Sequence, residues 1–223
     1  MKKFKSLFIL TVLFSLTLVG CVDGTDDQSV DGVSAATKNR YRESEIQEYE
    51  GARLDPAVGP RDNSINGVQT VNIDNYQLKL TGLLDNVIDL EYDEIRALDT
   101  YARKITLYCV EGWDATILWE GVLLKDIMDL AGVNPNANTV IFHAVDGYTT
   151  SLPLKTIIDN GLILAYSANG LDLPPEMGYP FIVVAENKLG YKWARWVSEI
   201  ELSDDPSYRG YWESRGYTNN ADV

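Results

Sequence analysis

Several residues and motifs that most catalytic chemistries need are scarce or missing in this sequence. Among 223 residues there is a single histidine, His143, and there are only two cysteines, Cys21 and Cys109. One histidine excludes metal sites built from several histidines, and any serine–histidine triad would depend on that residue alone. The chain also lacks a Cys-x-x-Cys pair, a phosphate-binding loop and a Gly-rich dinucleotide fingerprint. Most familiar catalytic motifs are therefore excluded.

Positive charge is also in short supply. The chain has 19 basic residues against 33 acidic ones, which gives a formal net charge of −14. Binding to a phosphate backbone requires clustered lysine and arginine, so the composition argues against a nucleic-acid partner. The excess of carboxylates favours solubility and repulsion from anionic lipid.

The first twenty residues contain no acidic side chain. Three lysines precede an apolar run over residues 7–19, which is too short for a comfortable membrane span and ends in Gly20 and Cys21. This arrangement predicts a lipoprotein signal peptide over residues 1–20, with cleavage before Cys21 and lipidation of its thiol. We therefore expect the protein to be lipid-anchored on the extracytoplasmic face of the cell membrane. The alternative is an uncleaved helical anchor.

Large apolar residues are rare directly after the signal. Residues 21–50 are rich in Asp, Gly, Ser, Thr and Glu, which predicts a flexible acidic tether. Prolines and glycines over residues 51–70 predict an irregular lead-in. The remaining residues, 71–220, are long enough for one domain with a real core.

Strand and helix signals alternate within residues 71–220. Alternating or β-rich patterns predict strands at 76–81, 104–110, 139–144, 148–152, 162–166, 181–185 and 195–202. Apolar residues at helical spacing predict a helix over 119–130 that stops at Gly132, and a second helix from Pro153 to Asn160. Asp146 and Gly147 form a turn signal between two strands. The pattern predicts a single strand-rich mixed α+β domain.

Cys109 is the most informative candidate for chemistry. It leaves a predicted strand into a loop with Glu111 and Gly112, and lipidation of Cys21 would leave it no cysteine in the chain to pair with. A thiolate is a strong soft ligand for a transition metal, and the Glu111 carboxylate could reach the same site. The alternative is a buried core cysteine beside a surface carboxylate. His143, in an apolar run, is more often a structural residue.

The residues around Cys109 resemble a known family. Thr106-Leu-Tyr-Cys-Val-Glu-Gly-Trp113 is similar to the molybdenum-binding stretch of the sulfite-oxidase family, the oxidoreductase molybdopterin-binding domain. This family includes the catalytic subunit of periplasmic methionine-sulfoxide reductases. Further similar segments follow in order at 119–126, 142–153, 169–175, 178–180, 190–200, 210–213 and 215–217.

The resemblance implies a sulfite-oxidase-type fold, a molybdenum-molybdopterin cofactor and a set of site residues. Cys109 would ligate the molybdenum and Glu111 would lie near it. Lys192 and Arg195 would hold the pterin phosphate, which suits a point charge and a guanidinium fork. The implied cofactor-binding positions are His143, Asp146, Gly147, Tyr148, Thr149, Thr150, Gly190, Tyr191, Lys192 and Arg195.

The resemblance also implies an activity, namely two-electron oxygen-atom transfer on a small sulfoxide- or sulfite-like substrate outside the cytoplasm. The cofactor would carry the redox chemistry while the protein positions the substrate. Because the sequence has no haem-binding or flavin motif, electrons would pass to or from a redox partner such as a membrane cytochrome.

The sequence departs from the family pattern in two informative places. Ile182 stands where longer members have an arginine, and residues 1–7 contain no arginine pair of the kind that directs export of folded molybdenum enzymes. Both departures favour the alternative function, a cofactor-free, lipid-anchored binding or scaffold module on the same fold, with an anionic ligand.

Overall fold

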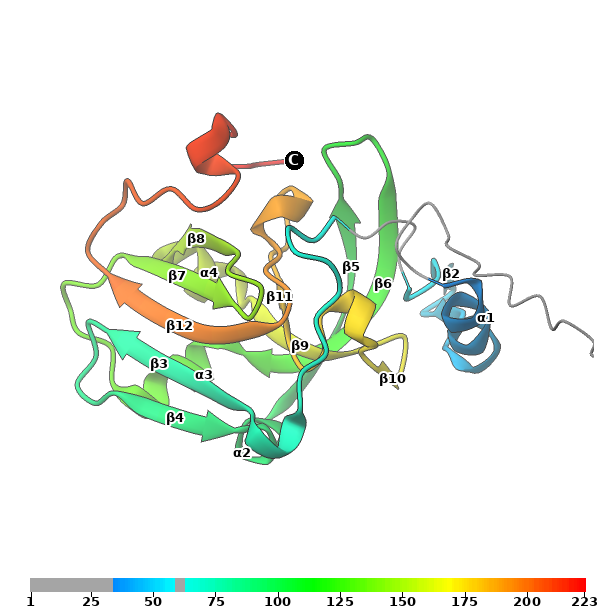
Figure 1. Ribbon diagram of the computed structural model, residues 1–223, viewed down its shortest axis with the longest axis horizontal. Coiled ribbons are helices and arrows are strands. Elements are labelled where there is room, and N and C mark those ends of the chain that lie inside the picture. Colours follow the sequence, from blue (N-terminus) through cyan, green and yellow to red (C-terminus); the bar gives the residue numbers. More distant parts are fainter. Residues whose placement is uncertain (1–33, 59–62) are drawn as a thin grey trace, which may run out of the picture.

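The computed structural model describes residues 34–58 and 63–223 (Figure 1). The predicted signal peptide and the predicted lipidation site, Cys21, lie outside the described residues. Within the described ranges, no helix combines the length and the apolar character that crossing a membrane requires.

Two five-stranded sheets form the body of the molecule. The first has the order β10-β9-β6-β5, with β11 also paired to β9. Its strands are β5 (Thr100–Tyr108), β6 (Asp114–Leu123), β9 (Ile163–Ala168), β10 (Leu171–Asp172) and β11 (Ile182–Val184). The second has the order β4-β3-β12-β7-β8. Its strands are β3 (Gln77–Gly82), β4 (Ile88–Glu91), β7 (Thr139–Ala144), β8 (Thr149–Pro153) and β12 (Val197–Ser203).

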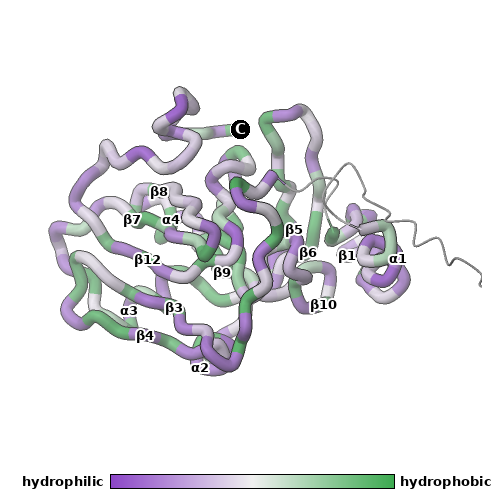
Figure 2. The backbone as a smooth tube through the Cα atoms, viewed as in Figure 1, coloured by the Kyte–Doolittle hydropathy of each residue, from purple (hydrophilic) through white to green (hydrophobic). Residues whose placement is uncertain are grey.

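The alternating pattern of the sequence explains how these strands reach the core. In β3, Leu78 and Leu80 are fully buried while Gln77 and Lys79 are exposed. Residues of both sheets belong to one hydrophobic cluster, and Figure 2 shows the apolar stretches along β6 and β9. The expectation of a single strand-rich α+β domain is therefore confirmed.

The helices are short and sit between strands. Besides α1, which is described below, they are α2 (Tyr92–Arg96), α3 (Leu124–Ala131) and α4 (Leu154–Asn160). The 3-10 turns are η1 (Ile73–Asn75), η2 (Pro175–Met177), η3 (Gly190–Lys192) and η4 (Glu213–Arg215). α4 starts after Pro153 and ends at Gly161, which has a positive φ of 56°, as the sequence predicts.

The helix predicted over 119–130 is correct only from Leu124 onward. Trp119–Leu123 instead continue β6, which pairs with β5 on one side and β9 on the other. A central strand that is buried on both faces is apolar at nearly every position, so its pattern resembles that of a buried helix.

The predicted flexible tether is wrong for residues 35–50. This stretch forms α1 (Ala35–Ser44) and the first strand of a small hairpin, β1 (Glu48–Tyr49) with β2 (Ala52–Arg53). The buried Glu45 carboxylate accepts hydrogen bonds from the Ala57 backbone N–H at 2.7 Å and from Asn169 Nδ2 at 3.0 Å. Polar contacts dock this segment, and apolar composition could not reveal them.

A buried ion pair holds the C-terminal residues 204–223, which run from β12 to the tip of the β5–β6 hairpin (Figure 1). Lys192 Nζ donates to Glu213 Oε1 at 2.5 Å and to the Ser151 carbonyl at 2.9 Å, and both charged side chains are fully buried. Thr150 Oγ1 donates to the same Glu213 oxygen at 2.6 Å. Burial lowers the pKa of Lys192, and the neighbouring Glu213 carboxylate opposes that shift.

The ion pair gives the first prediction. Glu213→Gln keeps the side-chain volume but leaves the buried Lys192 ammonium without its counter-charge, so the free energy of unfolding should fall by about 3–5 kcal/mol. Urea denaturation followed by tryptophan fluorescence measures the change. Asp159→Asn is the control, because it removes the partner of the exposed Lys155 and should have little effect. Equal losses in the two variants would contradict a stabilising role for the buried pair.

Candidate functional site

A cavity of about 500 Å³ lies where several parts of the chain meet. These parts are the tip of the β5–β6 hairpin, the turn between β7 and β8, the region around η3, the C-terminal segment, residues 63–65, and single residues of η2 and β11. Its volume lies within the range of small-molecule sites. The lining residues are Asn63, Ser64, Ile65, Leu107, Cys109, Val110, Glu111, Trp113, Ala115, Ile117, Asp146, Tyr148, Met177, Ile182, Gly190, Tyr191, Trp193, Arg195, Trp196, Trp212 and Tyr217.

The β5–β6 hairpin brings Cys109 to the cavity. Its backbone N–H donates to the Trp113 carbonyl at 2.9 Å, and the Gly112 N–H donates to the Cys109 carbonyl at 3.1 Å. Gly112 has a φ of 85°, a conformation that disfavours residues with a Cβ atom. The tight loop therefore fixes the position of the half-buried Cys109 at the end of a long strand.

Two polar side chains accompany the thiol. Asn63 Nδ2 lies 3.9 Å from Cys109 Sγ, and the Glu111 carboxylate accepts a hydrogen bond from Trp113 Nε1 at 3.3 Å. Asn63 was missed by sequence reasoning, because it lies 46 residues before Cys109 in a segment without regular structure. No local pattern in the sequence signals this contact.

The turn between β7 and β8 forms a second wall. Asp146 Oδ1 accepts a hydrogen bond from the Tyr148 N–H at 2.9 Å, and the Tyr148 hydroxyl donates to the Tyr191 carbonyl. Burial raises the pKa of Tyr148 above its ordinary value, so its hydroxyl stays protonated and remains a donor. The turn and η3 are thus joined directly across the cavity.

Arg195 supplies the cationic side chain among the lining residues that the structure describes. Its guanidinium donates to the Glu176 carbonyl at 2.9 Å and lies 4.6 Å from the ring centre of Trp196. Ile182 also lines the cavity and is joined to Arg195 by an isolated β-bridge. The position that departs from the family pattern therefore lies beside the one arginine of the described cavity.

The structure brings seven of the predicted site residues together at the cavity, and five lie elsewhere. The seven are Cys109, Glu111, Asp146, Tyr148, Gly190, Tyr191 and Arg195. The five residues outside the lining are His143, Gly147, Thr149, Thr150 and Lys192. Lys192 and Thr150 both bind Glu213. A contact between Lys192 and a phosphate stays a prediction, which would require the ammonium to exchange its carboxylate partner.

Thr149 and His143 have other surroundings. The Thr149 carbonyl accepts a hydrogen bond from the Tyr211 N–H at 2.8 Å, and its hydroxyl is 3.0 Å from that of Tyr208. His143 lies on β7 and contacts Glu201 of β12. Both residues therefore have structural partners outside the cavity.

Aromatic side chains from the C-terminal segment complete the cavity. Trp212 and Tyr217 line it, and their ring centres are 5.3 Å apart. Tyr217 also packs edge-on against Tyr191 at 5.2 Å. The similar segments at 210–213 and 215–217 include Trp212 and Tyr217, but nothing in their local pattern assigned them to a site.

The lining fits the cofactor that the resemblance implies. A soft sulfur donor at Cys109 suits molybdenum, a guanidinium at Arg195 suits a phosphate, and aromatic faces suit a planar pterin. A sulfur ligand, a guanidinium and aromatic faces of the kind this cofactor requires therefore lie together at one cavity.

Known proteins are similar in sequence to most of this domain. A family model described as the oxidoreductase molybdopterin binding domain matches residues 65–212. The uncharacterized oxidoreductase YuiH of Bacillus subtilis (strain 168) is 35% identical over 148 residues, which cover 66% of this chain and 74% of YuiH. YedZ1 of Azospira oryzae, named as a protein-methionine-sulfoxide reductase subunit, is 32% identical over 151 residues, 67% of this chain and 57% of its own length.

More distant relatives are longer proteins. Sulfite oxidase of Arabidopsis thaliana is 27% identical over 182 residues, 66% of this chain and 46% of its own length. The sulfane dehydrogenase SoxCD from Paracoccus pantotrophus superposes with a TM-score of 0.62 at 17% identity, over 93% of this chain and 59% of that chain, which shows a shared fold. With the family model covering residues 65–212, the chain belongs to the oxidoreductase molybdopterin-binding domain family, whose cofactor is molybdenum-molybdopterin.

Proposed function

We propose that this protein reduces a small sulfoxide by two-electron oxygen-atom transfer outside the cytoplasm. The observation that carries the proposal is the position of Cys109, whose rigid loop opens on a cavity. The described residues line this cavity with aromatic rings, two carboxylates and one guanidinium. When bound there, the molybdenum centre supplies the exchange of an oxygen atom and two electrons. Relatives named as a methionine-sulfoxide reductase subunit and as a sulfite oxidase support this reaction class.

The reaction balances with an external electron donor. The sulfur–oxygen bond of the sulfoxide breaks, two electrons and two protons are taken up, and a sulfide and water leave. The sequence contains no haem-binding or flavin motif. A redox partner, such as a membrane cytochrome, would therefore supply the electrons.

The charges of the cavity favour a neutral sulfoxide over anionic sulfite. Among the described lining residues, Glu111 and Asp146 carry carboxylates, and Arg195 carries the guanidinium that would bind the cofactor phosphate. With that guanidinium engaged, an anionic substrate would approach two carboxylates, and charges of the same sign repel each other. The volume of about 500 Å³, shared with a cofactor, leaves room for a small substrate.

The location rests on the first residues of the sequence. The basic start, the apolar run and Cys21 support export and lipidation, which would hold the enzyme at the extracytoplasmic face of the cell membrane. A lipid anchor would also keep the cavity close to a membrane-bound electron donor.

Cys109→Ser tests the reaction. The change removes the soft ligand with little change in volume, so sulfoxide reduction should be lost while the melting temperature stays within a few degrees. Metal content, melting temperature and turnover of a neutral sulfoxide and of sulfite are measured on the same samples. Thr106→Ser, on the same strand but outside the lining, is the control. Undiminished molybdenum content and activity in Cys109→Ser would overturn the proposal, and absence of molybdenum from the parent would select the cofactor-free module.

Arg195→Gln tests the phosphate contact. Loss of the guanidinium should weaken cofactor affinity by at least about tenfold, since one charge-assisted contact contributes about 1.5–3 kcal/mol, and should therefore lower the ratio of molybdenum and pterin to protein. Arg53→Gln, an exposed arginine on β2, is the matched control. The same cofactor ratio in both purified variants would leave Arg195 with a structural role only, through its contacts with the Glu176 carbonyl and Trp196.

Cys21→Ser tests the anchor. Without the thiol, no acyl chain can be attached, so the variant should appear either uncleaved or in the soluble fraction. Membrane fractionation and the mass of the intact chain give the readout. A variant that remains acylated and sediments with the membrane like the parent would rule out lipidation at Cys21.

A further inference from the structure

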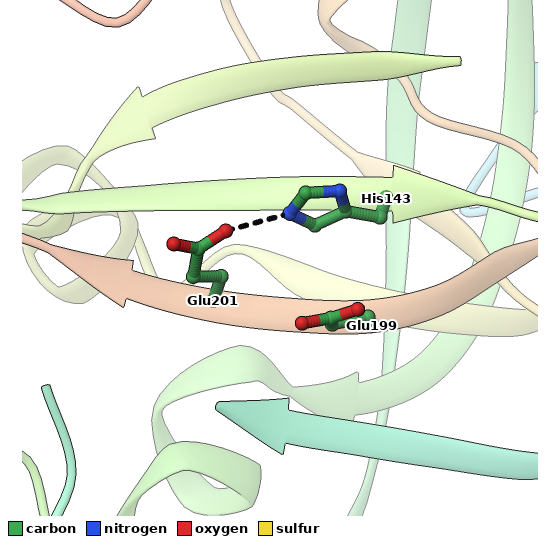
Figure 3. A group of neighbouring side chains, drawn as sticks. All are labelled: His143, Glu199 and Glu201. Atoms are coloured by element: carbon green, nitrogen blue, oxygen red, sulfur yellow. Dashed lines mark hydrogen bonds and ion pairs between the residues drawn. The ribbon is translucent and has the colours of Figure 1, made fainter. Parts of the chain in front are cut away.

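Three potential metal ligands meet on the sheet that contains β7 and β12, away from the cavity (Figure 3). They are His143 on β7 and Glu199 and Glu201 on β12, and their ligand atoms all lie within 4.8 Å of one another. His143 Nε2 is 2.9 Å from Glu201 Oε2. None of the three lines the cavity around Cys109.

The strand register brings these side chains together. Glu199 is the direct cross-strand partner of His143, and Glu201 follows two positions later on the same face. Phe142 and Ile200, which alternate with them, are fully buried in the core on the opposite face. The backbone hydrogen bonds of two central strands therefore fix the cluster, with little dependence on flexible loops.

We propose that His143, Glu199 and Glu201 bind a divalent transition-metal ion of the Zn²⁺ class. One imidazole nitrogen and two carboxylate oxygens are donors that Zn²⁺ accepts at about 2.0–2.2 Å. Donors held within 4.8 Å reach such an ion by small rotations of the two glutamate side chains. The side chains of His143 and Glu201 are 29% and 36% exposed, so water can complete the coordination sphere.

The third donor separates this cluster from an ordinary histidine–glutamate ion pair. A single carboxylate would satisfy the imidazole, yet Glu199 adds a second negative charge at the same place. Two neighbouring carboxylates repel each other, and a divalent cation relieves that repulsion better than one imidazolium proton does. The net charge of −14 also attracts cations to the protein surface and so favours metal binding.

A neighbouring hydroxyl holds one of the ligands in place. Thr81 Oγ1, on β3, donates to Glu199 Oε1 at 2.5 Å, which leaves the second carboxylate oxygen available to an ion. Groups that orient ligands in this way are a usual part of metal sites. The imidazole ligand favours a transition metal over Mg²⁺ or Ca²⁺, which prefer oxygen donors alone.

The single histidine makes the test direct. In the full chain without a polyhistidine tag, every imidazole NMR signal comes from His143. One equivalent of Zn²⁺ should shift these signals, and the binding curve gives the affinity. Zinc held instead at Cys109 would leave the signals unmoved, and repeating the titration with Cys109→Ser isolates any thiol contribution.

Three variants complete the experiment. His143→Gln and Glu201→Gln keep their size and hydrogen-bonding capacity, and each should weaken Zn²⁺ binding, measured by calorimetry, by at least about tenfold, since loss of merely orienting groups costs about 10–100-fold. Asp89→Asn, an exposed carboxylate on β4 of the same sheet, should leave the affinity unchanged. Melting temperatures without metal establish that the variants are folded. Imidazole signals that do not respond to stoichiometric Zn²⁺, or equal affinity in all three variants, would overturn the proposal.

Discussion

The buried ion pair between Lys192 and Glu213 determines how the C-terminal segment meets the rest of the domain. Trp212 lies next to Glu213, and both Trp212 and Tyr217 are walls of the cavity. The second carboxylate oxygen of Glu213 is buried without a hydrogen-bond partner among the described residues, a cost that a pair optimised only for stability would avoid. The pair favours this placement of the segment, because a placement that separates the two side chains would leave a charge unpaired in the core.

The cavity is therefore built from two rigid supports that meet at η3. The β5–β6 hairpin carries Cys109, and an isolated bridge joins Tyr108 to Leu189 at the start of η3. Gly190 follows, where an added Cβ would lie 3.4 Å from the Tyr108 carbonyl. Lys192, at the end of the same turn, holds the C-terminal segment. One three-residue turn thus sets both the distance to the thiol and the position of the aromatic wall, as a preorganised cofactor site requires.

Local patterns in the sequence predicted seven strands of the two large sheets, though not β4, β6 or β10, and the position of Cys109, because alternation and a glycine loop depend on neighbouring residues. They failed where a distant partner decides the outcome. The order of α1 depends on Glu45 and Asn169, which are 124 residues apart, and the partner of Lys192 follows 21 residues later. The resemblance implied a phosphate contact for Lys192; the chain places a carboxylate of its own there, and the contact with a phosphate stays a prediction. The contact of Asn63 with Cys109 also joins residues that are distant in the sequence, so local patterns could not predict it.

Strand β12 connects the cavity with the outer cluster of His143, Glu199 and Glu201. Arg195 lies two residues before this strand begins at Val197, and the pairing with β7 shifts register between Val197 and Glu199. Such a bulge turns side chains that follow it, and Trp196, with a φ of 53°, introduces the bend. Glu199 and His143 are the first cross-strand pair after the bulge, so an ion bound by both would link the two strands there. The ligands of that ion lie on the outer face of the sheet, whereas Arg195, just before the strand, lines the cavity. This irregular segment of the chain therefore positions residues of two chemically different sites.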